Sequence, residues 1–160
     1  MSESKKQPEY VQDLNLPRYA FKVKNEGLKP QIFDAVRRKF VVLTPEEWVR
    51  QNYVEFLVQE CGFPRSLLAV EKALRYNQMN KRTDVVAYSR EGNPMLIIEC
   101  KAPSITIGQN AFDQIARYNM TLKVPYLTVT NGLNHYHCYI DHENKSYRFL
   151  PEAPNYADLT

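Results

Sequence analysis

The chain alternates short apolar runs with turn-forming residues, and this pattern predicts a series of strands interrupted by two helices. Side chains repeat every 2 residues in a strand and every 3.6 in a helix, so the spacing of apolar positions assigns each run. Strands are expected at residues 35–43, 66–76, 83–89, 94–101, 125–132, 135–141 and 146–150. The run 66–76 also fits a helix, but its shortness after a clear helix stop favours a strand.

Residues 44–62 give the strongest helix prediction. Thr44 suits the N-cap, Pro45 suits the first helical position, and Gly62 marks the stop. Three apolar residues one turn apart predict the buried stripe of this helix: Val49, Tyr53 and Leu57.

A second helix is expected over residues 108–123, with Ala111, Ile115 and Leu122 facing inward. The elements together predict an α/β fold in which a mixed β-sheet is flanked by α-helices, a restriction-endonuclease-like core. We expect three regions: a flexible or partly ordered N-terminal extension with a loose tail over 1–12, the folded domain, and a C-terminal tail. Their predicted bounds are 1–28, 29–150 and 151–160.

The composition narrows the classes of protein and of site that are expected. A chain of 160 residues is long enough for one substantial core. Its 21 basic and 18 acidic residues permit nucleic-acid binding without indicating it. The three cysteines show no CxxC spacing, which argues against a zinc site or a disulfide framework. No apolar run approaches membrane-spanning length, and the first residues lack the core of a secretory signal, so a soluble, cytoplasmic protein is expected.

A charged pair at the end of an apolar strand is the first sign of chemistry. Glu99 and Lys101 follow the run MLII and, two residues apart, project from one face of the strand. The turn REGN pairs this strand with the one that begins at Asp84, so Asp84 is expected beside Glu99. Adjacent carboxylates repel unless a cation lies between them, and Mg²⁺ prefers carboxylate oxygens. The alternative is a turn residue and a surface ion pair.

Several motifs carry a family resemblance. Asp84, fourteen intervening residues and then Glu-Cys-Lys resemble the catalytic signature of the PD-(D/E)xK nuclease superfamily, with Thr83 where proline is frequent. The downstream QIARY is similar to the QxxxY motif of one branch of that superfamily. With RRKFVVLTPEEWVRQ, TDVV, ECKAP and VTNG, these motifs resemble the N-terminal nuclease-type domain of type I restriction enzyme R subunits over residues 30–140. The sequence holds no GxxxxGK[ST] loop, so no helicase motor is expected from it.

The resemblance implies catalytic roles. Asp84 and Glu99 would hold a metal ion, and Lys101 would act on the attacking water and on charge in the transition state. Gln114 and Tyr118, one turn apart on the second helix, would face back over the sheet toward the acidic cluster and orient water or phosphate.

The first helix is expected to add a glutamate to this site. Helical geometry puts Glu46 on the inward line and Glu47 toward its edge, so Glu46 is predicted as the third metal ligand. A favourable first-turn charge explains either glutamate equally well. Arg50 also falls on the inward side, where it would pair with Glu46 or reach a phosphate.

The resemblance implies Mg²⁺-dependent hydrolysis of DNA phosphodiester bonds, with Mn²⁺ as a substitute. DNA and restriction-modification subunits are the expected partners, no membrane is expected, and a homo-oligomer is left open. The alternative is a non-catalytic nucleic-acid-binding or subunit-docking module with the same fold. Glu71 is interpreted as a plain exposed strand residue, with a place on a strand next to the site as the alternative. His135 and His137 alternate on one strand face as a metal pair would, but a hairpin surface is favoured because no third ligand is near in sequence.

Overall fold

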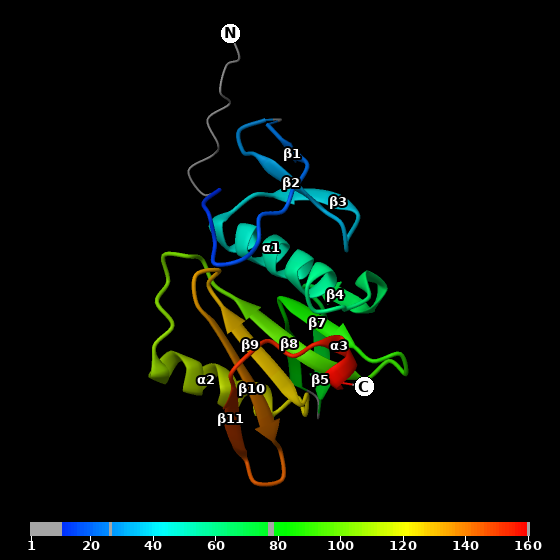
Figure 1. The fold of residues 1–160 in the computed structure, drawn as a ribbon, viewed down its shortest axis with the longest axis vertical. Coiled ribbons are helices and arrows are strands. Elements are labelled where there is room, and N and C mark those ends of the chain that lie inside the picture. Colours follow the sequence, from blue (N-terminus) through cyan, green and yellow to red (C-terminus); the bar gives the residue numbers. More distant parts are fainter. Residues whose placement is uncertain (1–10, 26, 77–78, 160) are drawn as a thin grey trace.

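The computed structural model describes residues 11–25, 27–76 and 79–159, so most of the tail predicted over residues 1–12 lies outside the described residues. It contains a six-stranded sheet, a three-stranded sheet and a separate two-stranded ribbon (Figure 1). The strands are β1 Val23–Lys24, β2 Gln31–Asp34, β3 Lys39–Val42, β4 Leu68–Val70, β5 Ala73–Tyr76, β6 Met79–Arg82, β7 Val85–Tyr88, β8 Pro94–Cys100, β9 Tyr126–Thr130, β10 His135–Asp141 and β11 Ser146–Leu150. The helices are α1 Pro45–Gln59, the 3₁₀ turn η1 Arg65–Leu67, α2 Gln109–Met120 and α3 Tyr156–Leu159.

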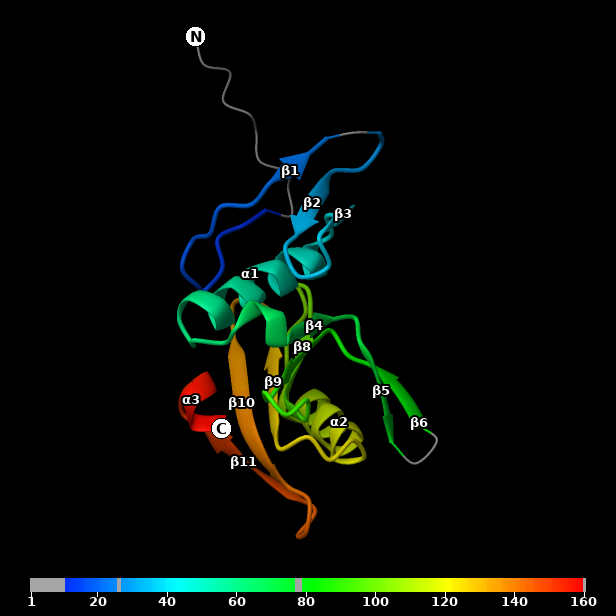
Figure 2. The same cartoon turned by 90° about the vertical axis from the view of Figure 1, so that its right-hand side faces the viewer.

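The six-stranded sheet has the order β11-β10-β9-β8-β7-β4. Strands β8 and β9 run parallel, and the other neighbours are antiparallel, so the sheet is mixed. Alternate residues of β8 belong to two different core clusters: Ile98 packs with α1 on one face, and Ile97 packs with α2 on the other. The predicted mixed sheet flanked by helices is confirmed, and Figure 2 shows α2 beside the sheet.

Helix α1 forms as its sequence predicts. The Thr44 hydroxyl accepts a hydrogen bond from the Glu47 backbone N–H at 3.0 Å, and Pro45 begins the helix. The three residues of the predicted stripe are fully buried: Val49, Tyr53 and Leu57. This stripe seats α1 on the sheet, so the first turn of the helix lies at a defined place relative to the strands.

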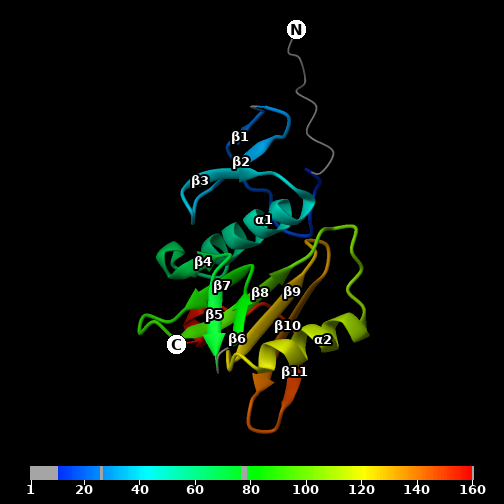
Figure 3. The ribbon, with the colours of Figure 1, turned by 180° about the vertical axis from the view of Figure 1, so that it is seen from behind.

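The segment 66–76 is extended from Leu68 onward, as predicted, but Ser66 and Leu67 belong to the 3₁₀ turn η1 and the strand is broken in two at Glu71. Glu71 adopts a positive φ of 53° between β4 and β5, which turns the chain out of the six-stranded sheet. Strand β5 then pairs with β6, and the two form a ribbon outside the main sheet, seen in front in Figure 3. A single backbone conformation thus decides where the sheet ends.

The inward face of α2 differs from the prediction. Ala111 is exposed and Ile115 is only partly buried, whereas Phe112, Ala116 and Asn119 are buried. The Phe112 ring packs against three aromatic rings of the β10–β11 hairpin: Tyr136, Tyr147 and Phe149. This aromatic contact buries the largest apolar side chain of the helix and sets its rotation.

Segments at both ends of the described chain pack against the domain. The Asn15 backbone N–H donates to the Gly132 carbonyl at 2.8 Å, and the Trp48 indole donates to the Gln12 carbonyl at 2.9 Å. At the other end, Leu159 is buried in the cluster around α1. Across the described ranges, no helix is long and apolar enough to span a membrane.

Candidate active site

Asp84 and Glu99 meet where the β7–β8 pair ends. The last paired residues are Val85 and Ile98, so Asp84 and Glu99 occupy the next position of the same antiparallel register. Asp84 Oδ2 accepts a hydrogen bond from the Cys100 backbone N–H at 2.7 Å, which fixes this carboxylate against the end of β8. The hairpin therefore brings Asp84 next to the strand that carries Glu99, although fourteen residues separate the two in the sequence.

Cys100 shows that further charges converge at this strand end. Its side chain belongs to the core cluster around α1, on the opposite face from Ile97. Burial raises the pKa of the Cys100 thiol well above its ordinary value, and the charges of Asp84, Glu99 and Glu46 raise it further while Arg50 lowers it. Three carboxylates and one guanidinium group thus lie within electrostatic range of one buried thiol.

The two glutamates in the first turn of α1 are buried in the opposite way from the prediction. Glu47 is 3% exposed and Glu46 is exposed, so the prediction of Glu46 inward and Glu47 at the edge was wrong. The cause is tertiary: Arg37 donates to Glu47 Oε1 at 2.6 Å, and Arg50 forms an ion pair with Glu47 Oε2. These cations neutralise Glu47 where the helix meets the sheet.

Glu46 nevertheless lies close to the strand end. Partial burial and the charge of Asp84 raise the pKa of Glu46, whereas the charges of Arg50 and Lys101 lower it. Lys101 follows β8 directly, and its backbone N–H donates to the Thr130 carbonyl at 2.8 Å, which holds it at this edge of the sheet. Four of the six predicted site residues therefore lie at the same end of the sheet, within electrostatic range of one another: Glu46, Asp84, Glu99 and Lys101.

Gln114 and Tyr118 lie one turn apart on α2, as predicted, but on its exposed side. Tyr118 has 45% of its surface accessible, and the buried face of the helix is formed by other residues. Both side chains are accessible to a ligand from solvent. Their part in the site stays a prediction.

Glu71 is the residue whose importance the sequence analysis missed. It is not a plain exposed strand residue, because it accepts hydrogen bonds from Arg37 at 3.1 Å and Arg82 at 2.9 Å. Its backbone N–H also donates to the Asp84 carbonyl at 3.0 Å. Glu71 therefore joins the β2–β3 turn to the start of β7. The only local signal was an acidic residue directly after the apolar run LLAV.

A network of charges surrounds Asp84. Arg50, 7% exposed, donates to Asp84 Oδ1 at 3.3 Å. Asp34 closes the far end of the network: burial would raise its pKa, but hydrogen bonds from the Arg37 backbone and side chain outweigh burial and hold the pKa below its ordinary value. Arg50 of α1 thus pairs with Asp84, and Glu47 links Arg50 to Arg37 of the β2–β3 turn.

The donor types suit a hard divalent ion. Asp84, Glu99 and Glu46 offer carboxylate oxygens, and partial burial together with the charge of Asp84 raises the pKa of Glu46. In the part of the chain that the structure describes, no three His, Cys, Asp or Glu side chains are arranged as ligands of one ion. The three carboxylates thus fit Mg²⁺ by donor type and not by their present arrangement. Arg50 would have to release Asp84 Oδ1 before both oxygens of Asp84 could face an ion.

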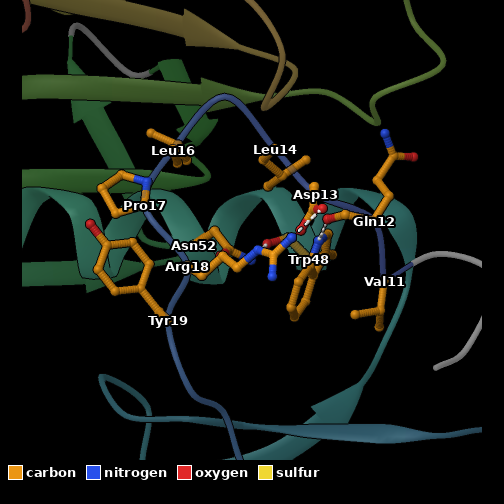
Figure 4. Close-up of a pocket in the computed structure, with 10 residues that line it drawn as sticks. All are labelled: Val11, Gln12, Asp13, Leu14, Leu16, Pro17, Arg18, Tyr19, Trp48 and Asn52. Carbon is orange, nitrogen blue, oxygen red and sulfur yellow. Dashed lines mark hydrogen bonds and ion pairs between the residues drawn. The ribbon is translucent and has the colours of Figure 1, made fainter.

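A cavity of about 330 Å³ lies elsewhere, between residues 11–19 and α1 (Figure 4). Trp48 and Asn52 line it from the helix, and Arg18 pairs with Asp13 beside it. None of the six predicted site residues lines this cavity. The carboxylate cluster is therefore separate from the cavity.

His135 and His137 are not on an exposed surface, contrary to expectation. His137 is 8% exposed and shares a hydrogen bond of 2.8 Å with Thr128, and His135 shares one of 2.7 Å with Thr130. Burial, aided by the charge of His135, lowers the pKa of His137 to about 4. Both imidazoles serve the β9–β10 pairing.

Residues 45–154 match the family of the type I restriction enzyme R protein N terminus, HSDR_N. The match covers more than half of the sequence. The chain belongs to this family. The resemblance to R subunits is thereby confirmed, whereas membership of the PD-(D/E)xK superfamily stays a prediction. Within the HSDR_N domain, the matched residues begin with α1 and include the six-stranded sheet, so the β1–β3 sheet lies outside them.

The fold of this HSDR_N domain also resembles a solved structure. That structure is a fragment assigned as an HsdR subunit of a type I restriction enzyme from Vibrio vulnificus YJ016. The TM-score is 0.51 at 20% sequence identity, and the similarity covers 73% of this chain and 24% of that chain. The chain thus spans about a quarter of that protein's length, and the similarity shows a shared fold. No curated protein matches the sequence.

Proposed function

We propose that this domain hydrolyses DNA phosphodiester bonds with Mg²⁺, for which Mn²⁺ would substitute. The convergence of Asp84, Glu99, Glu46 and Lys101 at one sheet edge carries the proposal. Membership of a restriction enzyme R protein family supports DNA as the substrate and restriction-modification subunits as partners. The PD-(D/E)xK signature formed by Asp84, Glu99 and Lys101 belongs to the same proposal.

Each residue has a distinct task in this proposal. Asp84, Glu99 and Glu46 would hold the ion, which when bound stabilises charge on the phosphate and makes its bound water more acidic. The Lys101 ammonium group would stabilise negative charge on the phosphate oxygens as water attacks phosphorus and the opposite deoxyribose oxygen leaves. Gln114 and Tyr118 would orient that water or the phosphate by hydrogen bonds.

Nicking of a supercoiled plasmid tests the proposal. We expect the wild-type chain to nick the plasmid in Mg²⁺ or Mn²⁺ and to stop in EDTA. Asp84→Ala and Lys101→Ala should each lower the rate by about 100-fold or more, because each removes charge stabilisation from the transition state. Arg148→Ala, on β11, is the control and should retain the wild-type rate. Equal rates in all four proteins would refute the assignment.

A non-catalytic module is the second candidate, and Arg50 is the observation that favours it. A guanidinium group already donates to Asp84 Oδ1, so the carboxylate is neutralised by the protein itself. Calorimetric titration with Mg²⁺ and Mn²⁺ separates the two functions. Millimolar or tighter binding that is lost in Asp84→Ala supports the hydrolase. Absence of binding by the wild-type chain supports the module.

A further inference from the structure

The positive charge of the chain is concentrated in two short segments, residues 22–39 and 72–82. Together they hold ten of the 21 basic and two of the 18 acidic residues, a net charge of +8. The other residues hold eleven basic and sixteen acidic side chains, a net charge of −5. The overall charge of +3 therefore conceals two basic segments on an acidic body.

Both basic segments form β-structure outside the six-stranded sheet. Residues 22–39 include most of the β1–β3 sheet, and residues 72–82 include the β5–β6 ribbon, which stands away from the main sheet in Figure 2. Seven of their basic side chains are exposed: Lys22, Lys29, Arg38, Lys39, Lys72, Arg75 and Arg82. A ligand in solution can reach this charge.

The β5–β6 ribbon is rooted directly at the candidate site. It leaves the sheet between Glu71 and Asp84, whose backbones are joined by a hydrogen bond of 3.0 Å. Thr83 is 1% exposed, and its N–H and hydroxyl both donate to the Lys72 carbonyl, at 2.9 and 2.8 Å. These bonds fix the base of the ribbon, so the Lys72 backbone is held against Thr83, the residue before Asp84.

The β1–β3 sheet is tied to the same point. Arg37, in the β2–β3 turn, donates to Glu71 at 3.1 Å and to Glu47 at 2.6 Å, and Arg82 of the ribbon donates to Glu71 at 2.9 Å. Arg38 follows in the same turn, Lys39 begins β3, and both are exposed. Glu71 therefore connects both basic segments at the residue that hydrogen-bonds Asp84.

We infer that the β1–β3 sheet and the β5–β6 ribbon together bind the phosphate backbone of duplex DNA on the two sides of Asp84. A duplex presents one negative charge per roughly 1.7 Å of its axis. The exposed cations are spread over the β1–β3 sheet and the β5–β6 ribbon, so they match this extended charge better than they match a small anion. The choice of DNA rests on the proposed function. The placement of the surface rests on the charge distribution and on the contacts of Glu71.

Fluorescence anisotropy with a labelled 20-bp duplex tests the inference, in EDTA so that no cleavage intervenes. Three double variants remove the same charge: Lys72→Gln with Arg75→Gln on the ribbon, Lys29→Gln with Lys39→Gln on the β1–β3 sheet, and Lys145→Gln with Arg148→Gln on the β10–β11 hairpin as the matched control. Each phosphate contact contributes about 0.9 to the salt slope. Each ribbon or sheet variant should lower the slope by about 2 and weaken binding by about tenfold or more at 0.1 M salt. The control should bind like the wild type.

Equal weakening by all three double variants would overturn the inference, because it would show that only net charge matters. Unchanged binding in the ribbon and sheet variants would overturn it as well. Thermal melting of each variant ensures that folded proteins are compared. The plasmid assay keeps the two proposals apart. If binding depends on the ribbon and sheet but no nicking occurs, the DNA-binding surface is supported and the hydrolase is refuted. If nicking occurs and binding does not depend on them, the hydrolase is supported and this surface is refuted.

Discussion

At the scale of single residues, Glu46 and Glu47 have opposite surroundings although they are neighbours on one helical turn. Glu47 is buried between the guanidinium groups of Arg37 and Arg50, and Gln51 adds a hydrogen bond of 3.1 Å. Glu46 is exposed and is influenced by the charge of Asp84. The first glutamate therefore suits chemistry at the strand end, and the second suits the support of that site.

Substitution by glutamine separates these roles. Glu47→Gln should destabilise the fold by about 3 kcal/mol, because it removes the one carboxylate that Arg37 and Arg50 share at this buried position. Glu46→Gln should stay within about 0.5 kcal/mol of the wild type, as exposed substitutions usually do, while it lowers plasmid nicking. Urea denaturation and the nicking assay measure the two effects. Equal destabilisation by both variants would contradict the assignment of Glu47 as the structural glutamate.

At the scale of elements, the turn between β9 and β10 links the sheet to the N-terminal segment. The Asn131 side chain accepts hydrogen bonds from the Leu133 and Asn134 backbone N–H groups, and Gly132 has a φ of 85°. Asn131 and Gly132 therefore form a turn just after β9, where the predicted strand 125–132 ends early. Leu14 packs so closely on this turn that a Cβ at Gly132 would lie 2.7 Å from Leu14 Cδ2.

We expect Gly132→Ala to destabilise the protein by about 2–3 kcal/mol, the sum of a positive-φ cost and steric overlap with Leu14. Gly92→Ala is the matched control, because Gly92 has a φ of 86° and nothing within 4 Å of the added Cβ. It should cost only about 1 kcal/mol. Urea denaturation of both variants checks the difference. In a chain that already carries Leu14→Ala, Gly132→Ala should cost nearly as little as Gly92→Ala. If it still costs more, overlap with Leu14 is not the cause.

At the scale of the whole molecule, the family match and the folded unit have different extents. The matched residues begin at 45, whereas Arg37 and Asp34 supply part of the charge network around Glu47. Ile32 is also fully buried. The β1–β3 sheet thus contributes to the stability of the site that the matched residues carry.

A chain restricted to residues 45–154 should therefore be less stable than the full chain by about 3 kcal/mol or more, since Glu47 loses a cation partner. Urea denaturation followed by circular dichroism measures this change. The emission of Trp48, the single tryptophan, should shift to the red because its contacts with Gln12 and Phe21 are removed. Arg37→Leu in the full chain separates loss of the ion pair from loss of the sheet. Equal stability of the short and full chains would contradict this account.

The sequence by itself determined what depends on neighbours along the chain. Thr44 and Pro45 start α1 through local hydrogen bonding and a preset φ, and residue spacing buries its stripe. The short REGN turn brings Asp84 into register with Glu99, because a hairpin pairs residues symmetrically about its turn. For the same reason, the principal charged residues of the site could be proposed before the structure was known.

Only the tertiary structure decided which charges are buried and which elements surround the site. Glu47 is inside because Arg37 arrives from another sheet, and Glu71 matters because it meets Arg37, 34 residues away in sequence. The cost of burying a charge depends on its partners in space, which residue spacing does not encode. The turn of the chain at Glu71 likewise follows from contacts on both of its sides. Local periodicity therefore predicts which face of a helix or strand is apolar, and ionic partners distant in sequence determine which charged side chains are buried.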